Sequence, residues 1–241
     1  MTAELPPPPW EKNRGGKRTA PKRRPLTLEV ITEKALEVLD RDGLDVLSMR
    51  KVAAELGVAV SALYAHVRDK DELLQVMYER VYSRFQVPEP DPANWRAQVR
   101  ELAWGMRTIL LEHRDMARIS MGRFPSGPEM ILQLERMFAL FLAAGLPVSL
   151  AAKAGDMLSL LVEGIVQEAE MWRGGAAEQG SAEEAADYFS RLPADRFPTL
   201  ARHGAVLFSE SADERFEVFL DVFIRGLESH LESSEDHRPA D

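Results

Sequence analysis

The stretch from Leu47 to Lys70, LSMRKVAAELGVAVSALYAHVRDK, restricts the possible fold more than any other part of the chain. Ser48 is a favourable N-cap, because its hydroxyl can accept a hydrogen bond from an amide that the first helical turn leaves unpaired. A helix is therefore expected over residues 49–56, and Gly57 is suited to end it, since glycine adopts positive φ at little cost. Residues 60–66 can form a second helix after a short corner. This order of elements predicts a helix-turn-helix.

The outward face of the second expected helix carries small side chains and a few hydrogen-bonding groups. Ser61, Ala62 and Ala65 are small, and Tyr64 and His66 add polar tips near the end of the helix. A short helix of this kind is typical of one that enters the major groove of DNA and reads base edges there.

The flanking helices complete a small domain. Asp69 and Glu72 have the spacing of a capping box, so a helix is expected to begin there. Lys70 lies in its first turn, where free amides and the helix dipole already favour an anion such as a phosphate. Upstream, residues 28–42 show an amphipathic helical pattern that Gly43 ends.

Residues 27–86 resemble the DNA-binding domain of the tetracycline-repressor (TetR) family of bacterial regulators. The resemblance rests on the runs S-M-R-K-V-A-x-E-L-G-V, A-L-Y-x-H-V and D-K-x-E-L-L. It implies contacts to a double-stranded DNA operator from the positions that match the contact residues of the family. Those positions are Ser48, Arg50, Val60, Ser61, Ala62, Tyr64, His66 and Lys70.

The chemistry of these side chains separates base contacts from phosphate contacts. Arg50 can bind a guanine through two hydrogen bonds, whereas Val60 can offer only apolar contact to a thymine methyl. The tetracycline repressor has a glutamine at the position of Val60 that reads adenine, so the operator of this chain should differ. Phosphate contacts, which position a protein without specifying sequence, are assigned to Ser48, Tyr64, His66 and Lys70. The alternatives are a packing role for His66 and a solvated charge for Arg50.

The net charge of −9 is unevenly distributed along the chain. Residues 1–26 contain seven basic and two acidic residues, a net charge of +5, which leaves −14 on the remainder. We expect this proline-rich segment to be a disordered basic arm whose Arg18, Arg23 and Arg24 contact DNA in the adjacent minor groove. The alternative is a solubilising tail with unspecific attraction to phosphates.

The sequence argues against several other classes of protein. It contains no cysteine, so disulfides and thiolate metal sites are excluded. The most apolar segment, residues 157–166, carries Glu163 in its middle, and no signal peptide is recognisable, which favours a cytoplasmic protein without membrane spans. Neither H-E-x-x-H nor a di-iron E-x-x-H pair occurs, and RGGKRT at residues 14–19 lacks the first glycine of a P-loop. We therefore expect no enzyme, no bound metal and no cofactor.

The rest of the chain predicts an all-α protein, in which a long helix joins the helix-turn-helix domain to a helical bundle. The expected domains are the arm at 1–26, the DNA-binding domain at 27–86, a ligand-binding and dimerisation domain at 93–231 and a disordered tail at 232–241. Helices are expected in the third domain at residues 95–113, 114–122, 126–145 with Ser126 as the cap, 149–172, 182–191, 197–203 and 213–231.

The helices expected at 149–172 and 213–231 have more apolar surface than a single core needs. Two copies of each could form a four-helix seam between subunits, and the family resemblance implies the same pairing. A two-fold homodimer would hold its recognition helices about 34 to 36 Å apart and bind a pseudo-palindrome.

The C-terminal region also resembles the ligand domain of tetracycline-type repressors. The matching motifs are HRD at 113–115, M-G-x-x-P at 121–125, G-x-x-x-E at 164–168 and F-x-x-x-L-D-x-x-I-x-G-L-E at 216–228. Ser120, however, replaces the family's metal-binding histidine, Leu102 its drug-binding asparagine and Arg136 its glutamine, while Glu168 retains the acidic contact. We therefore expect no binding of magnesium-tetracycline.

The expected ligand is instead a fairly large amphipathic molecule, because methionine-rich walls adapt to irregular shapes. The candidate apolar contacts are Leu102, Trp104, Met106, Met116, Phe124 and Met157, and the candidate polar contacts are Arg123, Arg136 and Glu168. The alternative is that these residues only fill the core of the bundle.

These observations favour a dimeric transcriptional repressor that an unknown small-molecule effector releases from DNA by binding its two conformations with different affinity. A regulator or activator that needs no effector is the second hypothesis. An all-α enzyme is a remote third.

Overall fold

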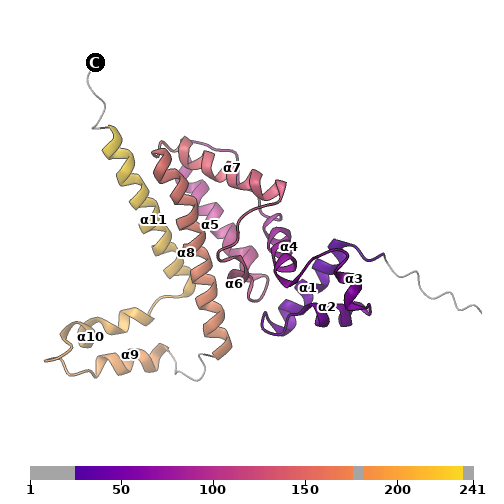
Figure 1. Cartoon of the computed structure of the whole chain (residues 1–241). Coiled ribbons are helices and arrows are strands. Elements are labelled where there is room, and N and C mark those ends of the chain that lie inside the picture. The colour runs from indigo at the N-terminus through magenta and orange to yellow at the C-terminus, as the bar shows by residue number, and fades with distance from the viewer. Residues whose placement is uncertain (1–24, 176–181, 236–241) are drawn as a thin grey trace, which may run out of the picture.

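The computed structural model describes residues 25–175 and 182–235, and every regular element in these ranges is a helix (Figure 1). The prediction of an all-α chain is therefore confirmed for this part of the protein. Arg18, Arg23 and Arg24 of the basic arm lie outside the described residues.

Four helices form the N-terminal unit: α1 (Leu28–Asp42), α2 (Met49–Leu56), α3 (Val60–Leu63) and α4 (Lys70–Tyr82). The Thr27 hydroxyl caps α1 by accepting a hydrogen bond from the Val30 amide at 3.4 Å, and Gly43 ends the helix with φ at 84°. The bounds of α1 and α2 are those that the sequence predicts.

The second helix of the helix-turn-helix is shorter than predicted, because α3 ends at Leu63 and residues 64–66 form a turn. The His66 and Val67 amides both donate to the Leu63 carbonyl, at 2.9 and 3.0 Å. This tight turn lets Leu63 and Val67 both enter the core, where their exposed fractions are 0% and 2%. The free energy gained by burying Val67 therefore exceeds what further residues of α3 would contribute.

The C-terminal unit contains α5 (Trp95–Leu111), α6 (Met116–Ser120), α7 (Pro128–Ala143), α8 (Val148–Gly175), α9 (Ala182–Ser190), α10 (Pro198–His203), the 3-10 helix η3 (Gly204–Phe208) and α11 (Ala212–Glu235). The predicted cap of α7 is wrong. Gly127 occupies the N-cap position without a side-chain hydrogen bond, and Pro128 begins the helix, as proline often does. The Ser126 hydroxyl donates instead to Glu79 of α4.

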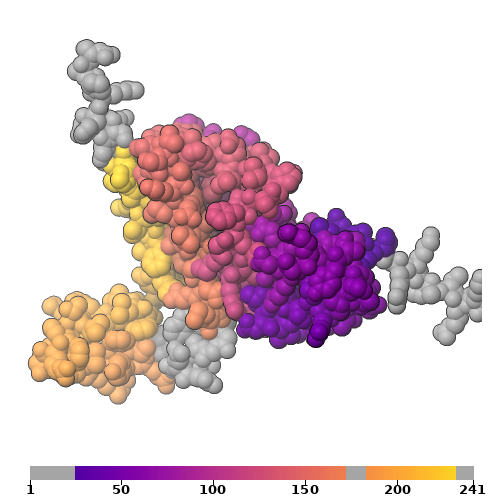
Figure 2. Space-filling view, viewed as in Figure 1, coloured from indigo at the N-terminus to yellow at the C-terminus, as the bar shows by residue number. Residues whose placement is uncertain are grey.

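The bundle is organised around α8, which packs against α5, α6, α7 and α11 (Figure 1). One face of α8 is fully covered, since Ala154, Leu158, Val162 and Val166 are all completely buried. Helices α9, α10 and η3 pack on one another and stand apart from this bundle in the space-filling view (Figure 2). None of the described helices is both long and apolar enough to cross a membrane.

Candidate nucleic-acid interface and ligand region

The geometry of the helix-turn-helix follows from two local signals. The Ser48 hydroxyl accepts a hydrogen bond from the Lys51 amide at 3.3 Å and so fixes the start of α2. Gly57 ends α2 in the left-handed conformation, with φ at 66°, and the Val58 amide donates to the Ala53 carbonyl at 3.0 Å. This corner sets α3 across α2.

The outer face of α2 and α3 is open to solvent. Arg50, Ser61 and His66 are exposed, Tyr64 keeps 53% of its surface exposed, and Val60 and Ala62 are half-buried between them. Six of the eight predicted DNA contacts are therefore at least partly accessible to solvent.

The other two predicted contacts, Ser48 and Lys70, also make hydrogen bonds within the chain. The Ser48 hydroxyl is the cap of α2, and the Lys70 ammonium donates to the Leu44 carbonyl at 3.2 Å. An ammonium has three donors, so this bond leaves Lys70 able to bind a phosphate as well.

The cations beside the recognition face differ in their partners. Arg41 pairs with Asp42 at 2.9 Å and with Glu55 at 2.7 Å, and Lys51 pairs with Asp42 at 3.2 Å. The hydrogen bond from Arg41 lowers the pKa of Asp42 to about 2, so this network stays ionised. Arg50, by contrast, has no ion-pair partner within the described ranges. Its guanidinium is free to bind a base or a phosphate.

Helix α4 connects this face to the C-terminal unit through one row of polar side chains. Asp71, Gln75 and Glu79 are four residues apart and therefore lie on the same side of α4. Arg123 donates to Asp71 at 2.7 Å and to Gln75 at 3.2 Å, and the Gly127 amide donates to Glu79 at 3.1 Å. The α6–α7 loop thus holds α4 along two turns.

The HRD motif makes a second connection between the two units. Asp115 adopts φ at 57°, an uncommon conformation outside glycine, and its carboxylate accepts a hydrogen bond from the Leu44 amide at 2.8 Å. Its own amide donates to Glu170 of α8 at 2.9 Å. His113 lies 3.0 Å from Asp40, near the end of α1. The corner between α5 and α6 is therefore fixed to both domains.

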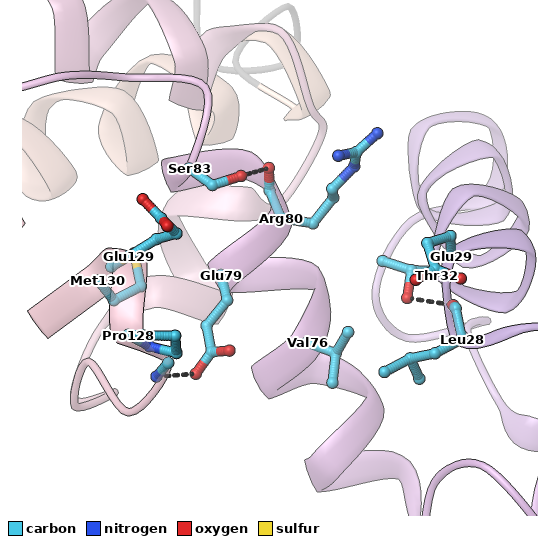
Figure 3. A pocket seen from close by; sticks show the side chains of 11 residues that line it. Leu28, Glu29, Thr32, Val76, Glu79, Arg80, Ser83, Pro128, Glu129 and Met130 are labelled. Atoms are coloured by element: carbon cyan, nitrogen blue, oxygen red, sulfur yellow. Dashed lines mark hydrogen bonds between the residues drawn. The ribbon is translucent and has the colours of Figure 1, made fainter.

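Two hollows lie beside α4. The first, of about 240 Å³, lies between α1, α4 and the start of α7 and is lined by Leu28, Val76, Glu79 and Met130, among others (Figure 3). Figure 3 shows Glu79 reaching from α4 to the backbone at the start of α7. The second, of about 510 Å³, lies between α4 and α6 and includes Arg123. Both hollows lie between the N-terminal unit and the bundle.

The predicted ligand residues occupy three different environments. Leu102, Met106 and Met116 belong to the buried core, with exposed fractions of 1%, 4% and 0%. Arg123 and Phe124 line the second hollow, where Phe124 is 84% exposed.

The remaining predicted ligand residues lie on the bundle surface. Met157 is 48% exposed on α8, Arg136 pairs with Glu89 at 3.4 Å, and Glu168 pairs with Arg215 of α11. The structure does not gather the whole predicted set around one cavity.

A buried polar cluster escapes sequence reasoning. Glu163 is the only buried carboxyl in the described part of the chain, with 6% of its surface exposed, and Tyr82 and Ser120 lie beside it. The available signal is one charge inside the apolar segment 157–166, which shows that Glu163 is unusual but not which side chains meet it.

Comparison with known proteins accounts for both units. Residues 31–77 match the family described as bacterial regulatory proteins, tetR family, and residues 87–231 match the tetracyclin repressor-like C-terminal domain. An HTH-type transcriptional regulator of Saccharopolyspora erythraea is 32% identical over 176 residues, which cover 73% of this chain and 74% of that protein. The class C tetracycline repressor of Escherichia coli is 30% identical over 206 residues, covering 84% of this chain and 91% of the repressor.

A solved structure is similar over most of the chain. ActR of Streptomyces coelicolor, in complex with actinorhodin, shares 40% identity and a TM-score of 0.79, covering 84% of this chain and 95% of ActR. These matches confirm the resemblance noted in the sequence and the expectation that the protein is not an enzyme. The chain therefore belongs to the tetR family of bacterial regulatory proteins.

Proposed function

We propose that the chain is a dimeric transcriptional repressor that binds a pseudo-palindromic operator and is released by a small amphipathic molecule. The observation that carries this proposal is the solvent-exposed surface of α2 and α3, which presents small and hydrogen-bonding side chains and Arg50, a cation without an ion-pair partner among the described residues. A face of this composition suits base-edge contacts in the major groove.

The DNA contacts divide by chemistry. Arg50 reads a guanine, Val60, Ser61 and Ala62 approach base edges, and Tyr64 and His66 bind phosphates. Ser48 contributes through the start of α2, and Lys70 binds a further phosphate at the start of α4. The basic arm adds contacts through Arg18, Arg23 and Arg24 in the cytoplasm, where the operator is found.

Dimerisation is supported by apolar side chains that the single chain leaves exposed. On α8, Met157 and Leu160 are 48% and 52% exposed, and on α11, Val218 and Val222 are 48% and 66% exposed. These two helices pack against each other, and each leaves apolar side chains exposed. A four-helix seam between two subunits would cover both.

The effector is proposed to be a fairly large amphipathic small molecule. Its class is suggested by ActR, whose structure contains actinorhodin. Ser120 lacks the imidazole that would hold a metal, so magnesium-tetracycline is not the proposed effector.

The test is a footprint on the DNA that flanks the gene for this protein, repeated with actinorhodin and with magnesium-tetracycline. A protected two-fold site that opens with actinorhodin and persists with tetracycline is expected. The matched control is the double variant Tyr64→Ala and Lys70→Ala, which should give no protection. Protection that persists across a broad panel of aromatic compounds would instead identify a regulator without an effector.

The arm has its own test, because its charge contribution can be measured. Deletion of residues 1–25 should weaken operator binding and flatten its dependence on salt, since each phosphate contact adds about 0.9 to the slope of log K against log salt concentration. An unchanged slope would mean that the arm does not touch DNA.

A further inference from the structure

Three buried polar side chains meet where α4, α6 and α8 converge: Tyr82 at the end of α4, Ser120 at the end of α6 and Glu163 in the middle of α8. The Tyr82 hydroxyl donates to Oε1 of Glu163 at 3.3 Å. The Ser120 hydroxyl donates to the Ala117 carbonyl at 3.0 Å and also interacts with both of the other groups. The cluster therefore joins three helices at one point.

Burying these polar groups costs free energy, which indicates that they do more than fill the core. Burial raises the pKa of Glu163, because a charged carboxylate is poorly solvated there. Burial, together with the nearby Glu163, also raises the pKa of Tyr82 well above its usual value, so the Tyr82 hydroxyl keeps its proton and remains a donor. A well-packed apolar pair is commonly as stable as a buried polar one, or more so. Stability alone does not explain the choice of these residues.

The position of the hydrogen bond between Tyr82 and Glu163 indicates its role. Tyr82 is the last residue of α4, the helix that carries the DNA-binding unit, and Glu163 belongs to the central helix of the bundle. The polar row of Asp71, Gln75 and Glu79 fixes α4 only to the α6–α7 loop. The bond between Tyr82 and Glu163 is a direct hydrogen bond from α4 to α8.

We propose that Tyr82 and Glu163 are positioning residues whose hydrogen bond sets the orientation of α4, and with it the DNA-binding unit, relative to α8. The inference deepens the proposed function, because the orientation of this unit decides how well the recognition face meets its operator. Loss of either partner removes this hydrogen bond and leaves the other buried polar group with Ser120 alone, whereas loss of both leaves neither of the two groups in need of the bond. The two residues should therefore act as one unit.

The chain offers well-matched variants. Tyr82→Phe removes only the donor, Glu163→Met removes the acceptor, and Glu163→Gln retains an oxygen that can accept the bond. Tyr78→Phe is the control, because Tyr78 lies on the same helix, is buried, has its ring centroid 4.7 Å from that of Tyr82 and makes no hydrogen bond through its hydroxyl in the described structure.

The decisive measurement is the distance between the two units, because a purely structural role would lower stability without moving them. The chain contains no cysteine, so Glu37→Cys on α1 and Glu101→Cys on α5, both exposed, can carry spin labels without other changes. Labelled chains are diluted into an excess of unlabelled chain, and the distance distribution is measured by pulsed electron spin resonance without DNA. Thermal melts confirm that each variant is folded.

We expect Tyr82→Phe and Glu163→Met to broaden or shift the distribution alike, their combination to add nothing, and Glu163→Gln and Tyr78→Phe to match the unsubstituted chain. Operator affinity should change by about two- to tenfold, equally in both single variants and their combination, as expected for one hydrogen bond. An unchanged distribution in Tyr82→Phe, or an equal change in Tyr78→Phe, would overturn the proposal. If the unsubstituted chain binds no operator, the proposed function fails, yet the distances still decide whether this bond positions α4.

Discussion

At the scale of single residues, the cations near the proposed DNA-binding face differ in whether an ion pair within the protein already occupies them. Arg41 and Lys51 form ion pairs with Asp42 and Glu55. Arg50, on the same helix as Lys51, has no such partner in the described ranges. A sequence cannot separate these cases, because Arg41 and Glu55 are brought together only by the packing of α1 on α2. Truncation of Arg50 should therefore lower operator affinity more than truncation of Arg41 or Lys51.

Arg50→Ala should lower operator affinity by about 1 to 3 kcal/mol and relax base preference at one position of each half-site, as loss of a bidentate guanine contact does. Fluorescence anisotropy with the operator and with single-base variants of it measures both effects. Arg96→Ala is the control, because Arg96 carries the same charge but pairs with Glu228 on the bundle. A similar loss in both variants would mean that Arg50 acts only through net charge.

Glu163 makes a prediction about pH at the same scale. Its pKa is raised in the folded protein above the ordinary value of 4.5, chiefly by burial. At pH values between 4.5 and the raised pKa of the folded protein, Glu163 holds a proton in the folded state that it has lost in the unfolded state. The free energy of unfolding must therefore fall as pH rises through this range. Urea unfolding at a series of pH values should show the unsubstituted chain losing stability relative to Glu163→Gln as pH rises above about 4.5. A parallel pH dependence in both proteins would show that Glu163 titrates normally.

At the scale of elements, capping residues in the sequence correctly predict those helix ends that depend on neighbouring residues in the chain. The bounds of α1 and α2 follow from Thr27, Ser48, Gly43 and Gly57, whose effects reach only a few residues along the chain. The end of the second helix and the cap of α7 were mispredicted because the decisive contacts are tertiary. Burial of Val67 turns the chain after Leu63, and Glu79 on α4 takes the Ser126 hydroxyl.

The same limit applies to the sites. The proposed DNA-binding face could be inferred from the sequence because its residues lie on one continuous motif, and which of them contact DNA stays a prediction. Tyr82 and Glu163 are separated by 81 positions, and no periodicity in either helix indicates that they meet.

The corner between α2 and α3 provides the prediction at this scale. Gly57 has φ at 66°, and a Cβ added there would meet no atom within 4 Å, so only backbone strain opposes a side chain. Gly57→Ala should destabilise the protein by about 1 kcal/mol in urea unfolding, the usual cost of the left-handed conformation outside glycine. Gly57→Asn is the matched control and should cost less, because asparagine tolerates this conformation better. Equal losses would show that the left-handed conformation is not the source of the cost.

At the scale of the whole molecule, charge and symmetry decide where DNA can bind. The body of the chain carries a net charge of −14 outside the basic first 26 residues, so it repels a duplex except at the recognition face. One such face offers few contacts, and α3 is only four residues long. A dimer supplies two faces to one duplex, which raises the apparent affinity without any new type of contact.

The exposed apolar side chains of α11 allow this dependence to be tested. Val222, which is 66% exposed, should be covered in the proposed seam, so Val222→Arg would bury an unpaired charge there and favour the monomer. Sedimentation velocity at micromolar concentration should show a dimer for the unsubstituted chain and a monomer for the variant, and operator affinity should fall by at least about tenfold because the second half-site is lost. Ile131→Arg introduces the same charge on α7, where Ile131 is 48% exposed, and should leave both measurements unchanged. A dimer that survives Val222→Arg but not Ile131→Arg would place the seam on α7, and the two recognition faces would then have a different spacing on DNA.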